Sequence, residues 1–189
     1  MTLKKRIRED FLQKRKRLTL KENLEKSDKI SIKVFDTTEY KKAKNVLIYL
    51  SLKDEVSTNK IVEDLFSKKK NVYVPKVDLK KDSMEAIRID KKTCFYNNKI
   101  GISEPVNGEK INKKDIDLII IPGIAFDYWG HRIGFGNGCY DRFLKGTSAF
   151  KLGVAFDFQI IESIPAEDHD IKVDMIITDK RVIRYDLDD

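Results

Sequence analysis

Short apolar runs rich in β-branched residues recur along the chain from residue 46 onward. Runs of this kind are typical of buried strands. They lie at 46–50, 71–74, 116–121, 151–156 and 175–178, and 86–89 is a further candidate. The run at 116–121 is almost wholly apolar and ends at Pro122 and Gly123, as expected of a parallel strand covered on both faces.

Apolar positions at helical spacing precede these strands and alternate with them. One face of a first helix carries Leu3, Ile7, Phe11 and Leu18. A second helix is predicted to begin at Thr19, because Thr19 and Glu22 have the spacing of a capping box. Further helices are expected at 61–66, from residue 140 onward and, as a short one, at 159–163.

Strands that alternate with helices predict a three-layer α/β/α fold with a mainly parallel sheet. The segment 90–114 is polar and contains Gly101, Pro105 and Gly108, so we expect a long excursion there. No Ser/Gly-rich linker and no internal repeat divides the 189 residues. One domain is therefore expected to span 1–189.

A glycine-rich loop follows the strand at 116–121. Four of the chain's nine glycines fall within nine residues: Gly130, Gly134, Gly136 and Gly138. Such spacing allows positive φ angles and lets backbone N–H groups converge, as in loops that cradle phosphates. A plain glycine hairpin is the alternative. We expect Arg132, Asp141 and Arg142 to lie in an exposed loop and the helix start that follows it. Their charged side chains favour a functional site over a plain hairpin.

Two familiar phosphate loops do not fit this segment. A P-loop requires Lys and Ser or Thr after its last glycine, and Cys139 and Tyr140 stand there instead. A dinucleotide fingerprint has the spacing GxGxxG directly after a strand, whereas this loop has GxGxG about a dozen residues beyond it. Asp157 follows the glycine loop at a sequence separation that would suit a ribose contact. Without the fingerprint, this separation alone does not indicate a dinucleotide site.

The same residues carry a family resemblance. The segment PGIAFD at 122–127, followed by GHRIGFGNGCYD at 130–141, resembles the signature of the 5-formyltetrahydrofolate cyclo-ligase (methenyltetrahydrofolate synthetase) family. Similar segments follow the family's order at 4–8, 50–55, 74–76 and 169–174, so the resemblance spans nearly the whole chain. Cys139 departs from the usual Tyr or Phe. Phe135 and Asn137 stand where some members carry basic residues.

The resemblance implies an activity. A member of this family converts 5-formyltetrahydrofolate to 5,10-methenyltetrahydrofolate with ATP and Mg²⁺ and releases ADP and phosphate. The formyl oxygen is phosphorylated and is then displaced by N10. Arg132 and Asp141 would be the catalytic residues, and Asp141 and Asp170 would bind Mg²⁺.

The resemblance also implies two binding sets. The ATP-binding set is Lys4, Lys5, Arg6, Ile7, Arg8, Arg132, Ile133, Gly134, Phe135, Gly136, Asn137, Gly138, Cys139 and Tyr140. The folate-binding set is Leu50, Glu55, Trp129, Phe135, Gly136, Asn137, Gly138 and Cys139.

The order of the chain supports a shared site independently. In open α/β sheets, ligands bind beyond the carboxyl ends of the strands, and Glu55, Lys76, the glycine loop and Asp157 each follow a predicted strand. On the first helix, Lys4, Arg8 and Arg15 lie within about 40° of one another at 100° per residue. A solvated basic face is the alternative for these three residues.

Composition sets further bounds. No apolar run approaches the ~20 residues of a membrane span, and the first residues lack a signal sequence. Cys94 and Cys139 offer no disulfide framework. A cytoplasmic protein without a membrane partner is expected, as a monomer or a weak homodimer.

The net charge of +7 raises the alternative of a nucleic-acid-binding protein. Basic residues cluster only at 4–8 and 14–17, and acidic residues are interleaved elsewhere, so we predict no nucleic-acid partner. Two further alternatives are a sugar-phosphate isomerase or CoA-transferase of similar sheet architecture, and a non-catalytic folate or nucleotide carrier. The isomerase would use a carboxylate base and no ATP, and turnover would exclude the carrier.

Overall fold

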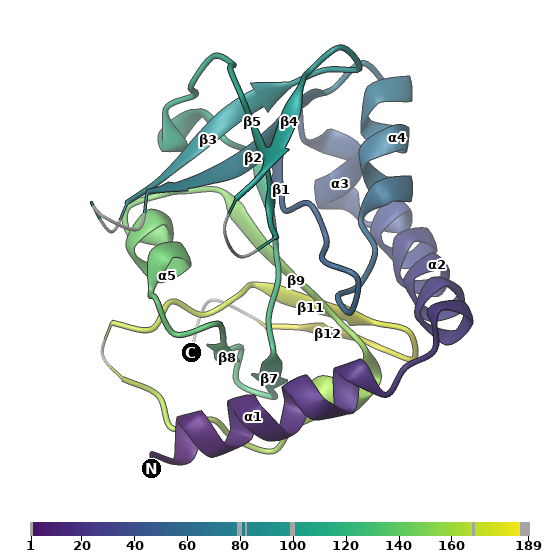
Figure 1. Cartoon of the computed structure of the whole chain (residues 1–189), viewed down its shortest axis with the longest axis vertical. Helices are drawn as coiled ribbons and strands as arrows, with labels where there is room; N and C mark the ends of the chain where they lie inside the picture. The colour runs from purple at the N-terminus through teal and green to yellow at the C-terminus, as the bar shows by residue number, and fades with distance from the viewer. Residues whose placement is uncertain (1, 79–80, 82, 99–100, 168, 186–189) are drawn as a thin grey trace.

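The computed structural model describes residues 2–78, 81, 83–98, 101–167 and 169–185. Within these residues, a seven-stranded sheet has the order β12-β11-β9-β6-β1-β2-β3 (Figure 1). The strands of this sheet are β1 (Asn45–Ile48), β2 (Asn71–Asp78), β3 (Ser83–Ile89), β6 (Leu118–Ile121), β9 (Phe150–Ala155), β11 (Met175–Thr178) and β12 (Val182–Arg184). The five inner strands pair in parallel, and β3 and β12 are antiparallel edges.

Helices cover both faces of the sheet. The helices are α1 (Leu3–Lys16), α2 (Leu20–Asp36), α3 (Thr38–Lys42), α4 (Asn59–Ser67) and α5 (Cys139–Leu144), with 3₁₀ turns η1 (Lys113–Asp115) and η2 (Asp157–Gln159). One apolar cluster joins α2, α3 and α4 to the sheet, and a second joins α5 to its other face. The predicted α/β fold with a mainly parallel sheet is confirmed.

Local sequence signals explain how the first two helices begin. The Thr2 side chain accepts a hydrogen bond from Lys5 N at the start of α1. The predicted capping box at Thr19 and Glu22 is confirmed, because both of its reciprocal hydrogen bonds form. Helix α1 ends at Lys16, so Leu18 lies beyond it, and Leu3 is exposed. Phe11 is the α1 residue that is buried in a small cluster with Ile133.

Five small strands within the described residues lie outside the main sheet. β7 (Ala125–Asp127) pairs with β8 (Arg132–Ile133) and with β10 (Ile160–Ile161), and β4 (Phe95–Asn97) pairs with β5 (Ser103–Pro105). The excursion predicted at 90–114 therefore contains a hairpin. The helix predicted at 159–163 is wrong, because the Gln159 amide donates to Gly123 O and Ile124 O while Ile160 and Ile161 pair with β7.

Strand ends also differ from the predictions. β6 begins at Leu118 rather than 116. The Asp117 carboxylate just before it accepts hydrogen bonds from Lys44 N and Asn45 N. β2 continues through Pro75 to Asp78, so Lys76 lies within a strand rather than after one. Proline is tolerated there because β1 pairs only with residues 71–73 of β2, so no ladder hydrogen bond is lost on that side.

Candidate functional site

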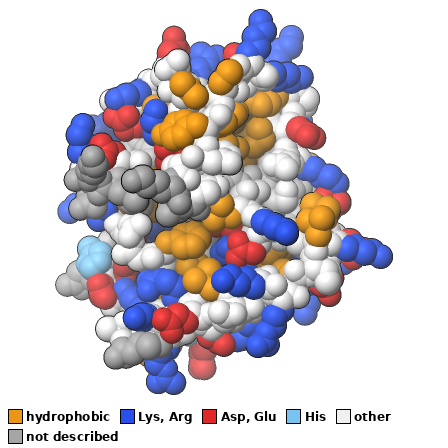
Figure 2. Space-filling model, viewed as in Figure 1, with side chains coloured by type: hydrophobic (Ala, Val, Ile, Leu, Met, Phe, Trp, Pro, Cys, Tyr) orange, Lys and Arg blue, Asp and Glu red, His pale blue; other side chains and the backbone are white. Residues whose placement is uncertain are grey.

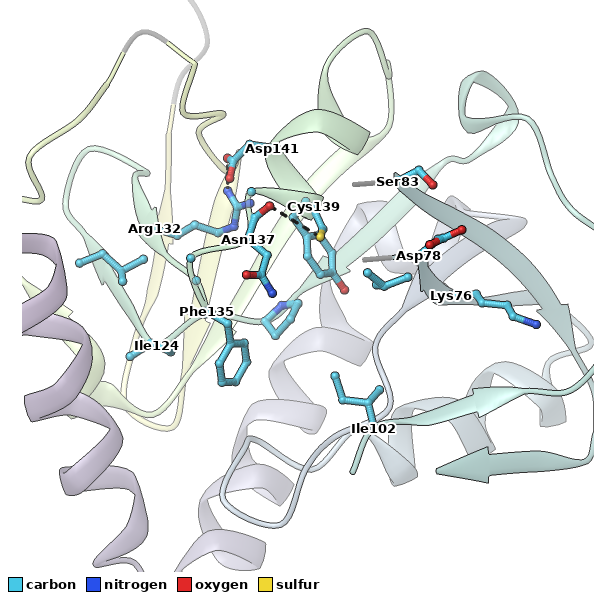
Figure 3. A pocket seen from close by; sticks show the side chains of 18 of the residues that line it. Lys76, Asp78, Ser83, Ile102, Ile124, Arg132, Phe135, Asn137, Cys139 and Asp141 are labelled. Carbon is cyan, nitrogen blue, oxygen red and sulfur yellow. Dashed lines mark hydrogen bonds and ion pairs between the residues drawn. The ribbon is translucent and has the colours of Figure 1, made fainter. Parts of the chain in front are cut away.

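A cavity of about 940 Å³ lies between the N-terminal helix, the glycine loop and the β2–β3 and β4–β5 hairpins. This volume is within the usual range of small-molecule sites. Figure 3 shows Arg132, Asn137 and Phe135 on one side of it and Lys76, Asp78 and Ser83 on the other. The predicted site residues that line the cavity are Lys4, Arg8, Arg132, Ile133, Gly134, Phe135, Gly136, Asn137, Gly138, Cys139, Tyr140, Asp141 and Asp170.

The glycine loop leads from β8 into α5, so it follows the β7–β8 hairpin rather than β6 itself. Gly136 and Gly138 have positive φ angles of +102° and +61°, which favour glycine. A Cβ atom at Gly138 would lie 2.8 Å from Arg142 Nη1, and one at Gly136 would lie 3.3 Å from Arg8 Nη2. Arg8 Nε also donates to Gly134 O at 2.8 Å. The glycines therefore let two arginines close against the loop backbone.

Arg132 and Asp141 form an ion pair at the base of this loop. Arg132 Nη1 lies 2.9 Å from Asp141 Oδ1 and donates to Ile171 O at 3.1 Å. Ile171 N donates to the same Asp141 oxygen at 3.2 Å. We expected Arg132 in an exposed loop, and this is wrong: Arg132 begins β8 and is only 9% exposed. The antiparallel pairing of β7 with β8 turns Arg132 toward the protein.

An ion pair between Lys4 and Asp170 connects α1 to the segment before β11. Lys4 Nζ lies 2.7 Å from Asp170 Oδ2 and 3.2 Å from Glu167 Oε1. Burial by itself would raise the pKa of Asp170, but the hydrogen bonds from Lys4 and from Glu167 N, with the charge of Lys4, hold this pKa below its usual value. Asp170 is next to Ile171, whose backbone N–H binds Asp141. The two predicted metal ligands are thus brought to the same edge of the cavity.

These two carboxylates fit a Mg²⁺ ion that is shared with phosphate. Among the described residues, no three His, Cys, Asp or Glu side chains gather into a metal site made by the protein alone. Mg²⁺ commonly uses only one or two carboxylates together with phosphate oxygens and water. The hydrogen bonds given for the described residues use Asp141 Oδ1 and Asp170 Oδ2. Asp170 Oδ1 lies 3.9 Å from His169 Nε2. The second oxygen of each carboxylate is therefore the one that could bind a cation.

The basic side of α1 faces the protein rather than solvent. Lys4 and Arg8 line the cavity, and Arg15 is only 2% exposed. Arg15 Nη2 lies 2.8 Å from Asp54 Oδ2, and Arg15 Nη1 lies 3.9 Å from Glu55 Oε1. The shared direction of the three side chains, expected from their spacing, is confirmed by these contacts.

Glu55 is buried beside the cavity rather than in its lining. Its carboxylate accepts a hydrogen bond from Leu52 N at 2.9 Å. Burial raises the pKa of Glu55. Burial and the charge of Glu55 also raise the pKa of Tyr140, which does line the cavity. The Tyr140 hydroxyl is buried and has no hydrogen-bond partner among the described residues.

Five other predicted residues lie outside the cavity lining. Lys5 and Arg6 are exposed on α1, and Ile7 packs with the cluster around Phe11. Leu50 is half-buried after β1, and Trp129 is exposed at the β7–β8 turn. Their roles in ligand binding remain predictions.

The Asp157 carboxylate binds other side chains of the protein. Its carboxylate accepts two hydrogen bonds from Arg181 at 2.7 and 2.8 Å and one from Thr178 Oγ1.

The wall opposite the glycine loop was largely missed by sequence reasoning. It includes Tyr96, Ile102 and Glu104 of the β4–β5 hairpin. The buried Glu104 carboxylate accepts hydrogen bonds from Tyr96 Oη at 2.7 Å and from Asn98 Nδ2 at 3.2 Å. The pairing of Glu104 with Tyr96 and Asn98 leaves no periodic pattern in the sequence. It is therefore seen only in the folded hairpin.

Comparisons with known proteins agree on one family. The model of the 5-formyltetrahydrofolate cyclo-ligase family matches residues 1–179. The chain is 30% identical to a 5-formyltetrahydrofolate cyclo-ligase of Mus musculus over 187 residues, which cover 92% of each chain.

Two solved structures are similar as well. An Aquifex aeolicus 5,10-methenyltetrahydrofolate synthetase has a TM-score of 0.87 and 38% identity, covering 100% of this chain and 94% of that one. A 5,10-methenyltetrahydrofolate synthetase from Mycoplasma pneumoniae has a TM-score of 0.76 and 28% identity, covering 94% and 99%. None of the helices within the described residues is both long and apolar enough to cross a membrane.

Proposed function

Because the chain belongs to the 5-formyltetrahydrofolate cyclo-ligase family, we propose that it performs this ring closure in an ATP- and Mg²⁺-dependent form. 5-Formyltetrahydrofolate is converted to 5,10-methenyltetrahydrofolate, and ATP is converted to ADP and phosphate. The observation that supports this most is the single cavity that brings together Lys4, Arg8, Arg132 and the glycine loop.

The chemistry explains why such a cavity suits ATP. A formamide oxygen is a poor leaving group as hydroxide. Transfer of the γ-phosphoryl group to that oxygen activates the formyl carbon, N10 attacks this carbon, and the oxygen departs with phosphate. The protein's part in phosphoryl transfer is mainly to position the reactants and neutralise charge.

We assign the described residues accordingly. Lys4, Arg8 and Arg132 neutralise the phosphates, and backbone N–H groups of the glycine loop orient them. Asp141 and Asp170 are the residues that would hold Mg²⁺, which supplies further neutralisation of phosphate charge when bound. Glu55 and Leu50, at the carboxyl end of β1, remain our proposals for holding the folate, together with Trp129.

The nucleic-acid alternative has less support than the enzyme. Lys4, Arg8 and Arg15 make contacts inside the molecule, which leaves fewer α1 cations for a polyanion. Figure 2 shows basic and acidic side chains interspersed over the visible face. The cytoplasmic location and the monomeric or weakly dimeric state remain predictions.

A spectrophotometric assay tests the proposal. Purified protein with 5-formyltetrahydrofolate is expected to form the methenyl product only when ATP and Mg²⁺ are both present, with ADP released in equal amount. Equally fast product formation without nucleotide would show that the phosphorylation step is wrong. Turnover of sugar phosphates would favour the isomerase alternative, and binding of both ligands without turnover would favour a carrier.

A further inference from the structure

One arginine of α1 is enclosed by the protein although its neighbours are not. Arg15 is only 2% exposed, whereas Lys14 and Lys16 beside it are exposed. Arginine stays charged at any ordinary pH, and a buried charge is costly unless it is paired. The partners of Arg15 therefore indicate what its burial serves.

The partners of Arg15 come from the turn after β1. Its Nε and Nη2 atoms lie 3.1 and 2.8 Å from the same oxygen, Asp54 Oδ2. Its Nη1 atom lies 3.9 Å from Glu55 Oε1. The hydrogen bond from Leu52 N goes to the other Glu55 oxygen, Oε2. One guanidinium thus meets two adjacent carboxylates, closely at Asp54 and at a longer distance at Glu55.

Helix α2 supports the backbone of the same turn independently of Arg15. The Asn23 amide donates to Glu55 O at 2.9 Å. Ser57 N donates to Ser27 Oγ at 2.9 Å. Because α2 already holds the path of the chain here, we expect the main effect of Arg15 on Glu55 to be electrostatic.

The groups around Glu55 act on its ionisation in opposite directions. Burial raises the pKa of Glu55, a backbone hydrogen bond and the charge of Arg15 lower it, and the charge of Asp54 raises it. Tyr49 and Tyr140 also face Glu55, and burial raises the pKa of each, so both hydroxyls stay neutral. Within the described part of the chain, Arg15 is thus the cation that favours the ionised form of Glu55.

Ionisation decides what Glu55 can bind. An ionised carboxylate accepts hydrogen bonds with both oxygens, whereas a protonated carboxyl group presents a donor at one of them. The pyrimidine half of the reduced pteridine carries N–H donors. A carboxylate that holds these donors must be ionised, and its hydrogen bonds are then stronger than neutral ones.

We propose that Arg15 is a positioning residue for the folate, which keeps Glu55 ionised beside the cavity without touching the ligand itself. This inference rests on the proposed function, in which Glu55 holds 5-formyltetrahydrofolate. Arg15 is not among the described residues that line the cavity, so it acts through Glu55. One side of α1 then serves both substrates, with Lys4 and Arg8 at the phosphates and Arg15 behind the folate.

Titration calorimetry over a series of pH values tests the inference. It gives Kd for 5-formyltetrahydrofolate and, separately, for a non-hydrolysable ATP analogue. In wild type, folate affinity is expected to fall at acid pH as Glu55 gains a proton. Arg15→Gln moves this fall to higher pH and weakens folate binding at the acid end by roughly tenfold or more, as for loss of a hydrogen bond to a charged group. Arg15→Lys keeps the charge and stays near wild type, and the analogue's Kd stays near wild type in both variants.

Asp54→Asn distinguishes an electrostatic role from a structural one. It breaks the same ion pair as Arg15→Gln, so a purely structural role predicts the same result for both variants. The inference predicts opposite shifts, because loss of the Asp54 charge favours the ionised form of Glu55 and moves the fall in folate affinity to lower pH. The direction of this shift decides the question even if Arg15→Gln is too unstable to titrate.

Two further variants complete the comparison. Arg17→Gln removes an exposed arginine just after α1 and is expected to change neither affinity. Glu55→Gln removes the titrating group, so its folate affinity is lower and loses the acid fall. Adding Arg15→Gln to Glu55→Gln then causes no further change in the pH dependence, because the two residues act as one unit.

Two results would overturn the inference. The pH dependence of folate binding could be the same in wild type, Arg15→Gln and Glu55→Gln. Alternatively, Arg15→Gln and Asp54→Asn could shift it in the same direction and weaken both ligands, with lower melting temperatures, which would show that Arg15 only fastens α1 to the turn. Either result in a wild-type protein that forms the product contradicts this inference alone. A wild-type protein that binds no formylfolate contradicts the proposed function.

Discussion

At the residue scale, the side chain of Arg132 both lines the cavity and holds two segments together. Its guanidinium lines the cavity and also binds Asp141 and Ile171 O, so it connects the glycine loop to the C-terminal segment. A buried arginine held by two partners is preorganised, and preorganised donors stabilise developing charge better than mobile ones do. Because Arg132 is buried, its removal is expected to affect folding as well as the catalysis that we propose.

We expect Arg132→Ala to lower kcat/KM by on the order of 10²–10³, which corresponds to about 2.7–4 kcal/mol of transition-state stabilisation. The melting temperature also falls, because Asp141 loses its ionic partner. Steady-state kinetics well below the melting temperature separate the two effects. Arg17→Ala, at an exposed position after α1, is the control. Unchanged kinetics in a folded Arg132→Ala protein would remove this residue from the site.

The two candidate metal ligands allow a second prediction. Asp141→Asn and Asp170→Asn are each expected to need more Mg²⁺ for half-maximal activity, because a neutral amide binds Mg²⁺ less well than a carboxylate does. Asp117→Asn is the control, since Asp117 binds Lys44 N and Asn45 N at the start of β1. A Mg²⁺ titration is run beside thermal melts. Lower melting points with unshifted Mg²⁺ curves would show that the carboxylates only order their loops.

At the scale of elements, ion pairs and hydrogen bonds between side chains hold the segments that surround the sheet. Arg15 fastens the end of α1 to the turn after β1 through Asp54. Asp157 fastens η2 to the β11–β12 hairpin through Arg181 and Thr178. These contacts join elements that do not share strand hydrogen bonds, so they determine where the loops lie.

The ion pair between Asp157 and Arg181 predicts a pH dependence of stability. Hydrogen bonds from Arg181 hold the pKa of Asp157 below its usual value, although burial acts in the opposite direction. A carboxylate with a lowered folded-state pKa stabilises the fold above its unfolded pKa of about 3.9, and this stabilisation is lost as the pH falls through the lower folded-state value. Melting temperatures of wild type and Asp157→Asn are therefore expected to differ most near neutral pH and to converge as the pH falls through the lowered folded-state pKa of Asp157. A difference that stays constant with pH would contradict the ionic contribution.

At the scale of the whole molecule, the cavity depends on both ends of the chain. Lys4 and Arg8 come from the first helix, and Asp170 comes from the segment before β11. The Lys4–Asp170 ion pair connects them across 166 positions. The proposed ATP site therefore requires that α1 is docked.

Changing Lys4 and Arg8 together to Ala is expected to raise KM for ATP far more than KM for the folate, because two cations near the phosphates are lost. Raising the salt concentration shrinks the difference from wild type, since salt screens partly exposed charges. The measurement is a pair of KM values at low and high ionic strength. An equal rise in both KM values would assign α1 a purely structural role, and lost RNA binding with intact turnover would support the nucleic-acid alternative.

Local signals in the sequence determined much of the fold and part of the site. β-Branched apolar runs, the capping box at Thr19 and the glycines at 134–138 each depend on neighbours within a few residues. Strand β11, the start of α2 and the loop that enters α5 were therefore predicted closely. The common direction of Lys4, Arg8 and Arg15 follows from helix geometry alone.

Tertiary structure decided which distant groups meet. The burial of Arg132 comes from the pairing of β7 with β8, and the hairpin wall with Glu104 comes from a polar segment without a regular period. The approach of Asp170 to Asp141 depends on Ile171, 30 positions beyond Asp141. Such contacts form only when the sheet and its loops close, because the packing free energy that holds them is shared among segments far apart in the chain.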